Sequence, residues 1–421
     1  MKFVLTGIAL ALAGNSGMAS AQSYDPMGAA NQQPPVKQQE KQQPQAPANA
    51  IQPSKKAMQP ILDLQTAVNA NDVANIPAKL AAAQAAATTK EDRYWIAEMQ
   101  LKMAAKAKDN AAAMAAVQAV QATGLASAAE LGSLFEGIGA AEFNAKQYGQ
   151  AVAAFQQQVA LDPTNAKALV NLAESRVAAG HVPEAIGDLQ RAIKVSSAGG
   201  KKADEDVYKR AVGLAYDAKL PIAVELSREW VTAYPNPGSW HNAIAIFRNG
   251  ASQDTEGSLD LLRLMEAAGA MQTAVDYSMF AQADMDQMNY NEAKAVLDSG
   301  ISAKVVDPAG SQFADIMAEL KTKKVPTAAE LDAAMNKSPT AFNLLRIGDR
   351  FYGLGDYAKA AEIYRKTLGK SGVDPEVVNL HIGMALARAG DKAGATEALN
   401  KVVGARADIA KLWLAYVQSK G

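Results

Sequence analysis

One stretch of the chain repeats another at a fixed distance. Residues 147–165 read QYGQAVAAFQQQVALDPTN, and residues 181–198 read HVPEAIGDLQRAIKVSSA. Ala151 of the first stretch matches Ala185 of the second, 34 positions later. A period of this length accommodates one pair of short helices. The chain is therefore expected to stack similar helix pairs against one another.

The residues between these matches favour helices throughout. From Ala57 onward, apolar residues return every three or four positions, and no alternating β-branched run stands out. Gly139, Ala151, Ala173 and Ala185 fall where two helices of a pair come close, because only small side chains fit there. Each pair leaves an apolar face that only the next pair can cover. The predicted fold is all-α, with about eight to ten helix pairs.

The pattern returns near the C-terminus. Ala360 and Ala395 lie 35 positions apart, each in a helix that follows a Gly-Asp turn. A helix pair of this length, with small residues at the crossing, an aromatic residue at the turn and proline at the exit, resembles the tetratricopeptide repeat. The resemblance covers residues 132–199 and 341–402, with a looser match over 274–301.

The resemblance implies a right-handed α-α superhelix whose inner face holds a peptide or a protein, and it implies no catalysis. It also sets the predicted organisation of the chain. The predicted segments are a signal peptide at 1–21, a disordered Gln/Pro-rich tail at 22–54, divergent helical repeats at 55–130, a repeat pair at 131–200, divergent repeats at 201–340, a repeat pair at 341–404 and a capping helix at 405–421.

The first residues follow the three-part pattern of a secretory signal. Lys2 is a short positive start, Phe3–Ala13 is an apolar run, and Ala19-Ser20-Ala21 offers small residues to a signal peptidase. The apolar run of about eleven residues is too short to span a bilayer as a helix. We therefore expect cleavage after Ala21 and export from the cytosol.

The rest of the chain bears on where an exported protein would reside. It contains no cysteine, which excludes disulfides, a lipid-modified cysteine and thiol chemistry. The absence of cysteine and the bacterial form of the signal sequence together favour the periplasm of a Gram-negative bacterium. Residues 22–54 are dominated by glutamine and proline and have almost nothing to bury, so they are expected to be a solvated tail or spacer. No later stretch is long and apolar enough for a membrane span.

Charge and motifs argue against nucleic acid binding and catalysis. The 42 basic and 43 acidic side chains leave a net charge of −1, without the concentrated positive face that nucleic acid requires. The three histidines, His181, His241 and His381, lie in different repeats without metal-site spacing, and are expected to be solvated or packed. Residues 284–295, DMDQMNYNEAKA, lack the third ligand, the glycine and the final glutamate of a calcium loop. We predict no enzyme activity, no metal and no cofactor.

The exposed face of each first helix is the predicted partner-binding groove. Phe143 and Tyr352 are the best candidate anchors, because an exposed aromatic ring buries apolar area at little entropic cost. The mixed charge of the face suggests a protein or peptide ligand. The candidate groove residues are Glu136, Phe143, Asn144, Lys167, Glu174, Asp349, Tyr352, Met384 and Arg388.

The sequence thus predicts a non-enzymatic scaffold or adaptor that binds a protein or peptide of the bacterial cell envelope. Two alternatives stay open. One is self-association into a homo-oligomer through uncovered end repeats. The other is recognition of glycan or peptidoglycan, with Tyr352, Trp240 and Trp413 as stacking residues, which an aromatic content of 6% disfavours.

Overall fold

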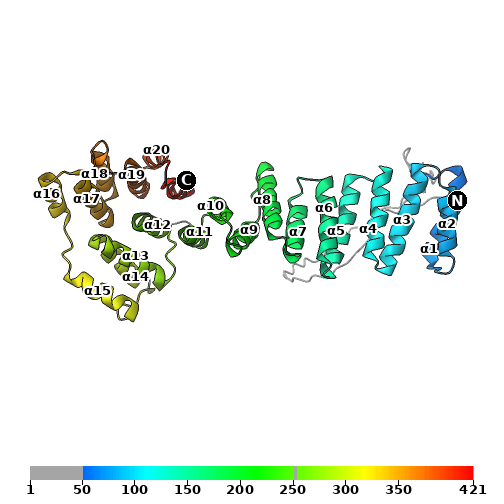
Figure 1. Cartoon of the computed structure of the whole chain (residues 1–421), viewed down its shortest axis with the longest axis horizontal. Coiled ribbons are helices and arrows are strands. Elements are labelled where there is room, and N and C mark those ends of the chain that lie inside the picture. Colours follow the sequence, from blue (N-terminus) through cyan, green and yellow to red (C-terminus); the bar gives the residue numbers. More distant parts are fainter. Residues whose placement is uncertain (1–50, 251–253, 421) are drawn as a thin grey trace, which may run out of the picture. The chain divides into compact units, whose positions relative to one another are not determined.

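The computed structural model describes residues 51–250 and 254–420. The predicted signal peptide at 1–21 and most of the predicted tail therefore lie outside the described residues. Within the described ranges the chain forms 21 helices and no strand (Figure 1). The predicted all-α fold of stacked helices is confirmed. The chain divides into two compact units between Gly199 and Gly200, called here the N-terminal unit and the C-terminal unit.

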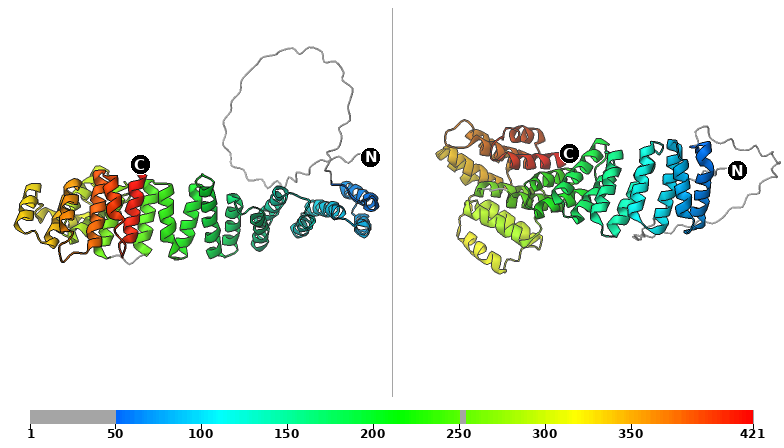
Figure 2. Two further views of the ribbon diagram at one scale, coloured as in Figure 1. Left: turned by 90° about the horizontal axis from the view of Figure 1, so that it is seen from above. Right: turned by 45° about the vertical axis from the view of Figure 1, so that its right-hand side comes forward.

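The N-terminal unit is a stack of helices that each pack against the next one in the sequence (Figure 2). Its helices are α1 (Lys55–Ala70), α2 (Ile76–Ala86), α3 (Lys90–Ala107), α4 (Asn110–Thr123), α5 (Ala128–Asn144), α6 (Tyr148–Leu161), α7 (Ala166–Ala178) and α8 (Val182–Ala198). The pairs α3/α4, α5/α6 and α7/α8 have the most extensive contacts.

The repeated residues have the packing roles that the sequence predicts. At Gly139 a Cβ atom would lie 2.8 Å from the ring of Phe155, so α5 and α6 approach as closely as they do because no side chain stands between them. Ala151 is fully buried at the same crossing. The turns repeat as well, because Lys146 and Gly180 both adopt left-handed backbone conformations, with φ of 60° and 85°.

The chain enters the N-terminal unit along α3. The backbone N–H and the hydroxyl of Ser54 donate to the two carboxylate oxygens of Asp92, at 2.7 and 2.9 Å. The indole N–H of Trp95 donates to the carbonyl of Ile51 at 3.1 Å. Residues 51–54 are therefore held on α3, and the predicted disordered tail is wrong for these four residues.

The C-terminal unit contains the remaining helices of the described part. They are α9 (Glu205–Asp217), α10 (Ile222–Ala233), α11 (Pro237–Gly250), α12 (Thr255–Ala267), α13 (Ala274–Asp286), α14 (Tyr290–Ser302), α15 (Ser311–Thr322), α16 (Ala328–Lys337), α17 (Ala341–Gly353), α18 (Tyr357–Thr367), α19 (Pro375–Ala389), α20 (Lys392–Leu399) and α21 (Ala407–Ser419).

The last helices of this unit pack back on its earlier ones. Helix α17 contacts α14, and α21 contacts α10, α12, α19 and α20 (Figures 1 and 2). One apolar core consequently joins Trp240 and Phe247 of α11 with Phe351 of α17, Tyr364 of α18 and Trp413 of α21. Helix α21 was expected to cap an open end of the solenoid. Its apolar face packs on the preceding helices α19 and α20, and also on α10 and α12 from the earlier part of the unit.

A close backbone approach makes this return possible. At Gly353, the last residue of α17, a Cβ atom would lie 2.7 Å from both the backbone nitrogen and the Cβ of Glu292 in α14. Any larger residue would push the two helices apart. The inner face of α17 is thereby brought against α12 and α14.

Candidate functional site

The predicted groove residues of the N-terminal unit lie on α5 and α7. The Lys167 ammonium is 2.6 Å from a carboxylate oxygen of Glu136, and Gln158 donates to the other oxygen at 3.1 Å. The ring of half-buried Phe143 packs edge-on against Tyr148, with centroids 5.4 Å apart. These side chains therefore form a partly open face of mixed charge with one aromatic pair.

The other two N-terminal candidates differ in exposure. Asn144, at the end of α5, is exposed, and Glu174 of α7 is half-buried. The N-terminal groove stays a prediction.

The predicted groove residues of the C-terminal unit are not open to solvent. Asp349, Tyr352 and Met384 are 7%, 4% and 1% exposed. Arg388 is half-buried; it donates to Glu266 and to the hydroxyl of Tyr357 and stacks over the Tyr357 ring. The expectation of an exposed groove here is wrong, because α12 and α14 cover this face.

The burial of Tyr352 shows how the face is filled. The guanidinium of Arg263 lies 4.9 Å from the centroid of its ring, and the ring of Tyr357 lies 5.0 Å away. Trp240 and Trp413, the other two residues proposed for glycan stacking, are 3% and 0% exposed. None of the three aromatic side chains is available to stack on a sugar in this structure.

A pocket does open on the first helices at the start of the C-terminal unit. It has a volume of about 300 Å³. It is lined by Lys209, Val212, Gly213 and Tyr216 of α9, Trp230 of α10, and Asn242, Ala245 and Ile246 of α11. The Trp230 indole N–H is held by Glu205 at 3.1 Å, so the ring is fixed as an apolar wall. Tyr216 remains 44% exposed at this pocket. We call it the α9–α11 pocket.

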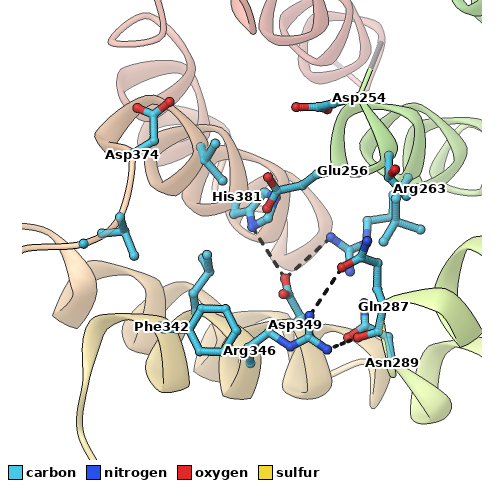
Figure 3. Close-up of a pocket in the computed structure, with 16 residues that line it drawn as sticks. Asp254, Glu256, Arg263, Gln287, Asn289, Phe342, Arg346, Asp349, Asp374 and His381 are labelled. Carbon is cyan, nitrogen blue, oxygen red and sulfur yellow. Dashed lines mark hydrogen bonds and ion pairs between the residues drawn. The ribbon is translucent and has the colours of Figure 1, made fainter.

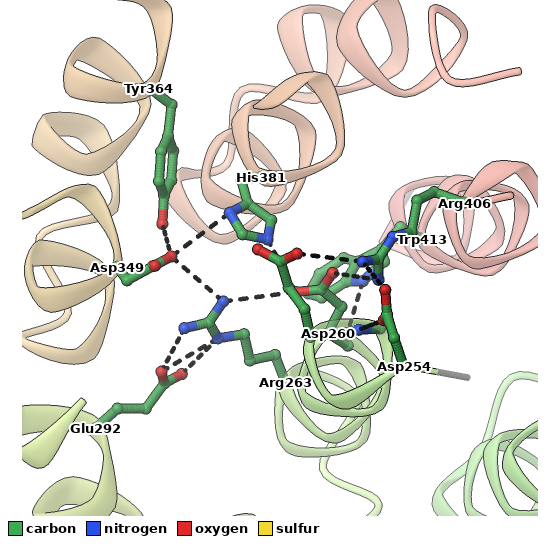
Figure 4. Close-up of polar contacts among 11 residues, drawn as sticks. Asp254, Asp260, Arg263, Glu292, Asp349, Tyr364, His381, Arg406 and Trp413 are labelled. Carbon is green, nitrogen blue, oxygen red and sulfur yellow. Dashed lines mark hydrogen bonds and ion pairs between the residues drawn. The ribbon is translucent and has the colours of Figure 1, made fainter. Parts of the chain in front are cut away.

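Charged residues that the sequence did not single out converge inside the C-terminal unit (Figure 4). Arg263 of α12 donates three hydrogen bonds to Glu292 of α14, at 2.7, 3.0 and 3.1 Å. It also lies 3.5 Å from Asp260 and 3.6 Å from Asp349. The Tyr364 hydroxyl donates to Asp349 at 2.8 Å.

His381 of α19 completes this arrangement. Its Nε2 is 3.1 Å from Asp260, and its Nδ1 is 3.5 Å from Asp349. Burial disfavours the imidazolium, but the carboxylates of Asp260 and Asp349 outweigh burial and raise the pKa of His381 to about 9. The histidine is therefore a charged partner in the core at neutral pH. The sequence predicted a solvated or packed histidine but not its ion pairs.

Arg406, just before α21, extends the network to the start of α12. It lies 2.8 Å from Asp254, 3.2 Å from Glu256 and 3.8 Å from Asp260. The charge cluster is defined here as Asp254, Glu256, Asp260, Arg263, Glu292, Asp349, His381 and Arg406. It ties α12 to α14, α17, α19 and the segment before α21.

A polar pocket of about 440 Å³ lies directly on the charge cluster (Figure 3). It is lined by Asp254, Thr255, Glu256, Leu259, Arg263, Gln287, Asn289, Phe342, Leu345, Arg346, Asp349, Gly372, Val373, Asp374, Val377 and His381. Within residues 51–250 and 254–420, no three histidine or acidic side chains converge as a metal site requires. Over the same ranges, none of the helices combines the length and apolar character needed to cross a bilayer.

Comparison with known proteins matches one part of the chain to a family. A tetratricopeptide repeat model matches residues 143–195. No curated protein matches the chain.

Several solved structures resemble the chain. A tetratricopeptide repeat protein from Parabacteroides merdae is 12% identical over 77% of this chain and 99% of its own, with a TM-score of 0.26. PilF of Pseudomonas aeruginosa is 12% identical over 63% and 98%, with a TM-score of 0.23. Yeast Tom70 is 14% identical over 79% and 89%, with a TM-score of 0.21. Likeness at this level carries no functional argument.

Proposed function

Because this chain is a tetratricopeptide repeat protein, we propose that it is a non-enzymatic scaffold that binds a segment of a partner protein on the inner face of its first helices. Repeats of this kind serve as protein-interaction scaffolds in general. The finer proposal concerns which part of the inner face is used.

The observation that carries the proposal is the α9–α11 pocket. Val212, Trp230 and Ile246 are 4%, 6% and 8% exposed and give the pocket an apolar interior. Tyr216 and Lys209 stand beside them and can contact a polar backbone. Burying one leucine or phenylalanine side chain of a partner in such a pocket contributes about 1.5–3 kcal/mol. An aromatic and apolar pocket with a polar rim is the arrangement found at interface hot spots.

The contrast within the C-terminal unit supports this choice. On α17 and α19 the corresponding side chains Tyr352 and Met384 are buried, and Arg263 packs on the Tyr352 ring, so these two predicted groove residues cannot contact a peptide. On α9 and α11 the face is open and carries an exposed tyrosine.

The N-terminal unit supplies a second candidate surface for the same function. Glu136 and Lys167 present both signs of charge, and Phe143 and Asn144 lie at the end of the same α5 face. We propose that these residues and Glu174 of α7 add polar contacts to the partner.

We further propose that the protein works in the bacterial cell envelope. The support is the signal-like pattern of residues 1–21 and the absence of cysteine. The mature protein is then expected to begin at Gln22, which N-terminal sequencing of the protein purified from its own host would test. An intact Met1 would refute export by this signal.

The main experiment replaces Tyr216 with a photo-crosslinking amino acid in intact cells. The matched control is Val403, which is 78% exposed in the same unit and does not line the pocket. Capture of one defined protein from position 216, and not from 403, supports the scaffold. Loss of that product on adding Ile246→Glu would tie it to the pocket.

Other outcomes decide between the alternatives. Capture of a second copy of this chain would support self-association in place of a scaffold for another protein. Equal products from positions 216 and 403, or none from either in a folded protein, would refute the proposed pocket.

A further inference from the structure

The polar pocket of the C-terminal unit carries an inference that is independent of the proposed scaffold function. We infer that it binds an organic cation, an alkylammonium or guanidinium group, attracted by the unbalanced negative charge of the charge cluster beneath it. The argument rests on the charge balance, the pocket walls and one unpartnered acceptor.

The charge cluster has more carboxylates than cations. Its five carboxylates are Asp254, Glu256, Asp260, Glu292 and Asp349. Its three cations are Arg263, His381 and Arg406. Two negative charges therefore remain unbalanced. At neighbouring Asp284, burial and the Glu292 carboxylate raise the pKa well above the usual range, which favours the neutral form.

Two further charges line the same pocket and cancel. Arg346 of α17 donates to the backbone carbonyl and side-chain oxygen of Gln287 rather than to a carboxylate. Asp374 is an exposed carboxylate that accepts from the Glu376 N–H at 2.9 Å at the start of α19. The surplus negative charge of the cluster is thus unchanged at the pocket. Surplus charge in a region of low dielectric is costly, and an incoming cation relieves that cost.

The pocket walls fit a cation with an apolar stem. Phe342 is 64% exposed although it lines the pocket, so its ring faces the solvent-filled space. Leu345 and Val377 also line the pocket and add apolar surface. An aromatic face attracts an ammonium or guanidinium group, and methylene groups pack on the apolar surface.

A buried acceptor at the pocket has no partner. Asn289 is 2% exposed, and its side-chain oxygen accepts no hydrogen bond although the residue lines the pocket. A buried acceptor without a donor is destabilising, because it has lost its hydrogen bonds to water without gaining another. An N–H donor of the bound cation would satisfy the Asn289 oxygen, whereas an apolar ligand would not.

The arrangement favours an organic cation over a metal ion. In the part of the chain that the structure describes, no group of three acidic or histidine side chains converges on one metal-sized position. The negative charge instead spreads along a pocket of about 440 Å³, and pockets of about 300–1,000 Å³ hold small molecules or side chains. Such a distribution suits a cation with several N–H donors and a carbon stem.

The test measures binding to the full-length mature protein by calorimetry at pH 7 and low salt. The probes are 1,5-diaminopentane, a free amine, and a capped pentapeptide with a single lysine, which presents the same group on a peptide. The neutral comparison is the same peptide with acetylated lysine. We expect one site for at least one cationic probe and none for the acetylated peptide. Preference for the diamine identifies a free amine as the ligand, and preference for the peptide identifies a basic side chain.

Charge-removing variants connect binding to the pocket. The double variant Asp254→Asn/Asp374→Asn removes two charges while asparagine preserves both helix caps. It is expected to weaken binding on the order of tenfold, because each of these carboxylates attracts the cation only modestly through solvent. Asp391→Asn, at the exposed cap of α20, is the matched control and should leave the affinity unchanged.

Three outcomes would overturn the inference. The first is that the acetylated peptide binds as tightly as the lysine peptide. The second is that Asp391→Asn weakens binding as much as the double variant does. The third is that millimolar Mg²⁺ or Ca²⁺ displaces the amine from one shared site. Absence of any binding to the folded protein would overturn it as well. None of these outcomes affects the crosslinking result expected at Tyr216.

Discussion

The substitution Arg263→Met tests whether the charge cluster holds the C-terminal unit together. Arg263 is 2% exposed and gives three hydrogen bonds to Glu292, while Asp260 and Asp349 lie within 3.6 Å of its guanidinium. Methionine preserves the stem but leaves these carboxylates short of one cation. Breaking a buried ion pair from one side costs about 3–5 kcal/mol of unfolding free energy.

The cost has an upper limit set by protonation. A carboxylate of ordinary acidity can take up a proton at pH 7 for about 4 kcal/mol, and at pH 5 for about 1 kcal/mol. The destabilisation caused by Arg263→Met should therefore shrink by about 3 kcal/mol between pH 7 and pH 5. This pH dependence separates an electrostatic cause from a packing defect, which would be the same at both values.

The assay is urea unfolding followed by tryptophan fluorescence, since Trp230, Trp240 and Trp413 all report on the C-terminal unit. The matched control is Arg228→Met. Its side chain is 29% exposed and its guanidinium lies 3.9 Å from Asp408, so the loss of unfolding free energy should stay within about 1 kcal/mol. A loss below about 1 kcal/mol for Arg263→Met at pH 7, or an equal loss at pH 5, would refute the reasoning.

Three further predictions address single contacts. Folding raises the pKa of His381 from 6.5 to about 9, so protonated His381 stabilises the fold fully below pH 6.5, and this stabilisation is lost as the pH rises through 9. The unfolding free energy of the natural protein should therefore fall between pH 6 and pH 9. His381→Gln should remove on the order of 3 kcal/mol of that fall. Gly139→Ala should destabilise the N-terminal unit by about 1–3 kcal/mol because its methyl group would meet Phe155, whereas Gly132→Ala on the same helix meets nothing within 4 Å and should be neutral or stabilising in thermal unfolding. Asp92→Asn should cost about 1–3 kcal/mol in the same assay, because an amide cannot accept all the N–H and O–H donors that the carboxylate accepts; an unchanged melting temperature would contradict this.

Sequence reasoning predicted the local structure because the repeat encodes contacts between neighbours. Gly139 and Ala151 mark the α5/α6 crossing in the sequence, and they occupy it in the structure. Lys146 and Gly180 occupy the same turn of successive repeats. Such contacts join residues close in the chain, so a periodic pattern contains the information needed to find them.

The return of the C-terminal repeats could not be predicted in this way. His381 contacts Asp260 across 121 positions, and no periodicity links a residue of α19 to one of α12. Tyr352 was expected to be exposed because it lies on an inner face, and the helices that cover it come from an earlier part of the chain. The same repeat position is exposed or buried according to long-range packing, which a single sequence does not specify.

The charge cluster selects the register of this long-range packing, and a compensating double variant tests that role. The apolar core of the C-terminal unit would tolerate a shift of α17–α21 along α12 better than the charges would, since a one-turn shift of about 5.4 Å breaks the ion pairs of Arg263 with Asp349 and of His381 with Asp260. Arg263→Met/Glu292→Leu removes one charge of each sign and should regain about 2 kcal/mol of what Arg263→Met alone loses. If the charge cluster fixes the register, its loss of two charges should let α17 and α19 exchange between several packings. The methyl resonances of these two helices should then be broadened. Sharp resonances with restored stability would instead show that apolar packing alone fixes the register.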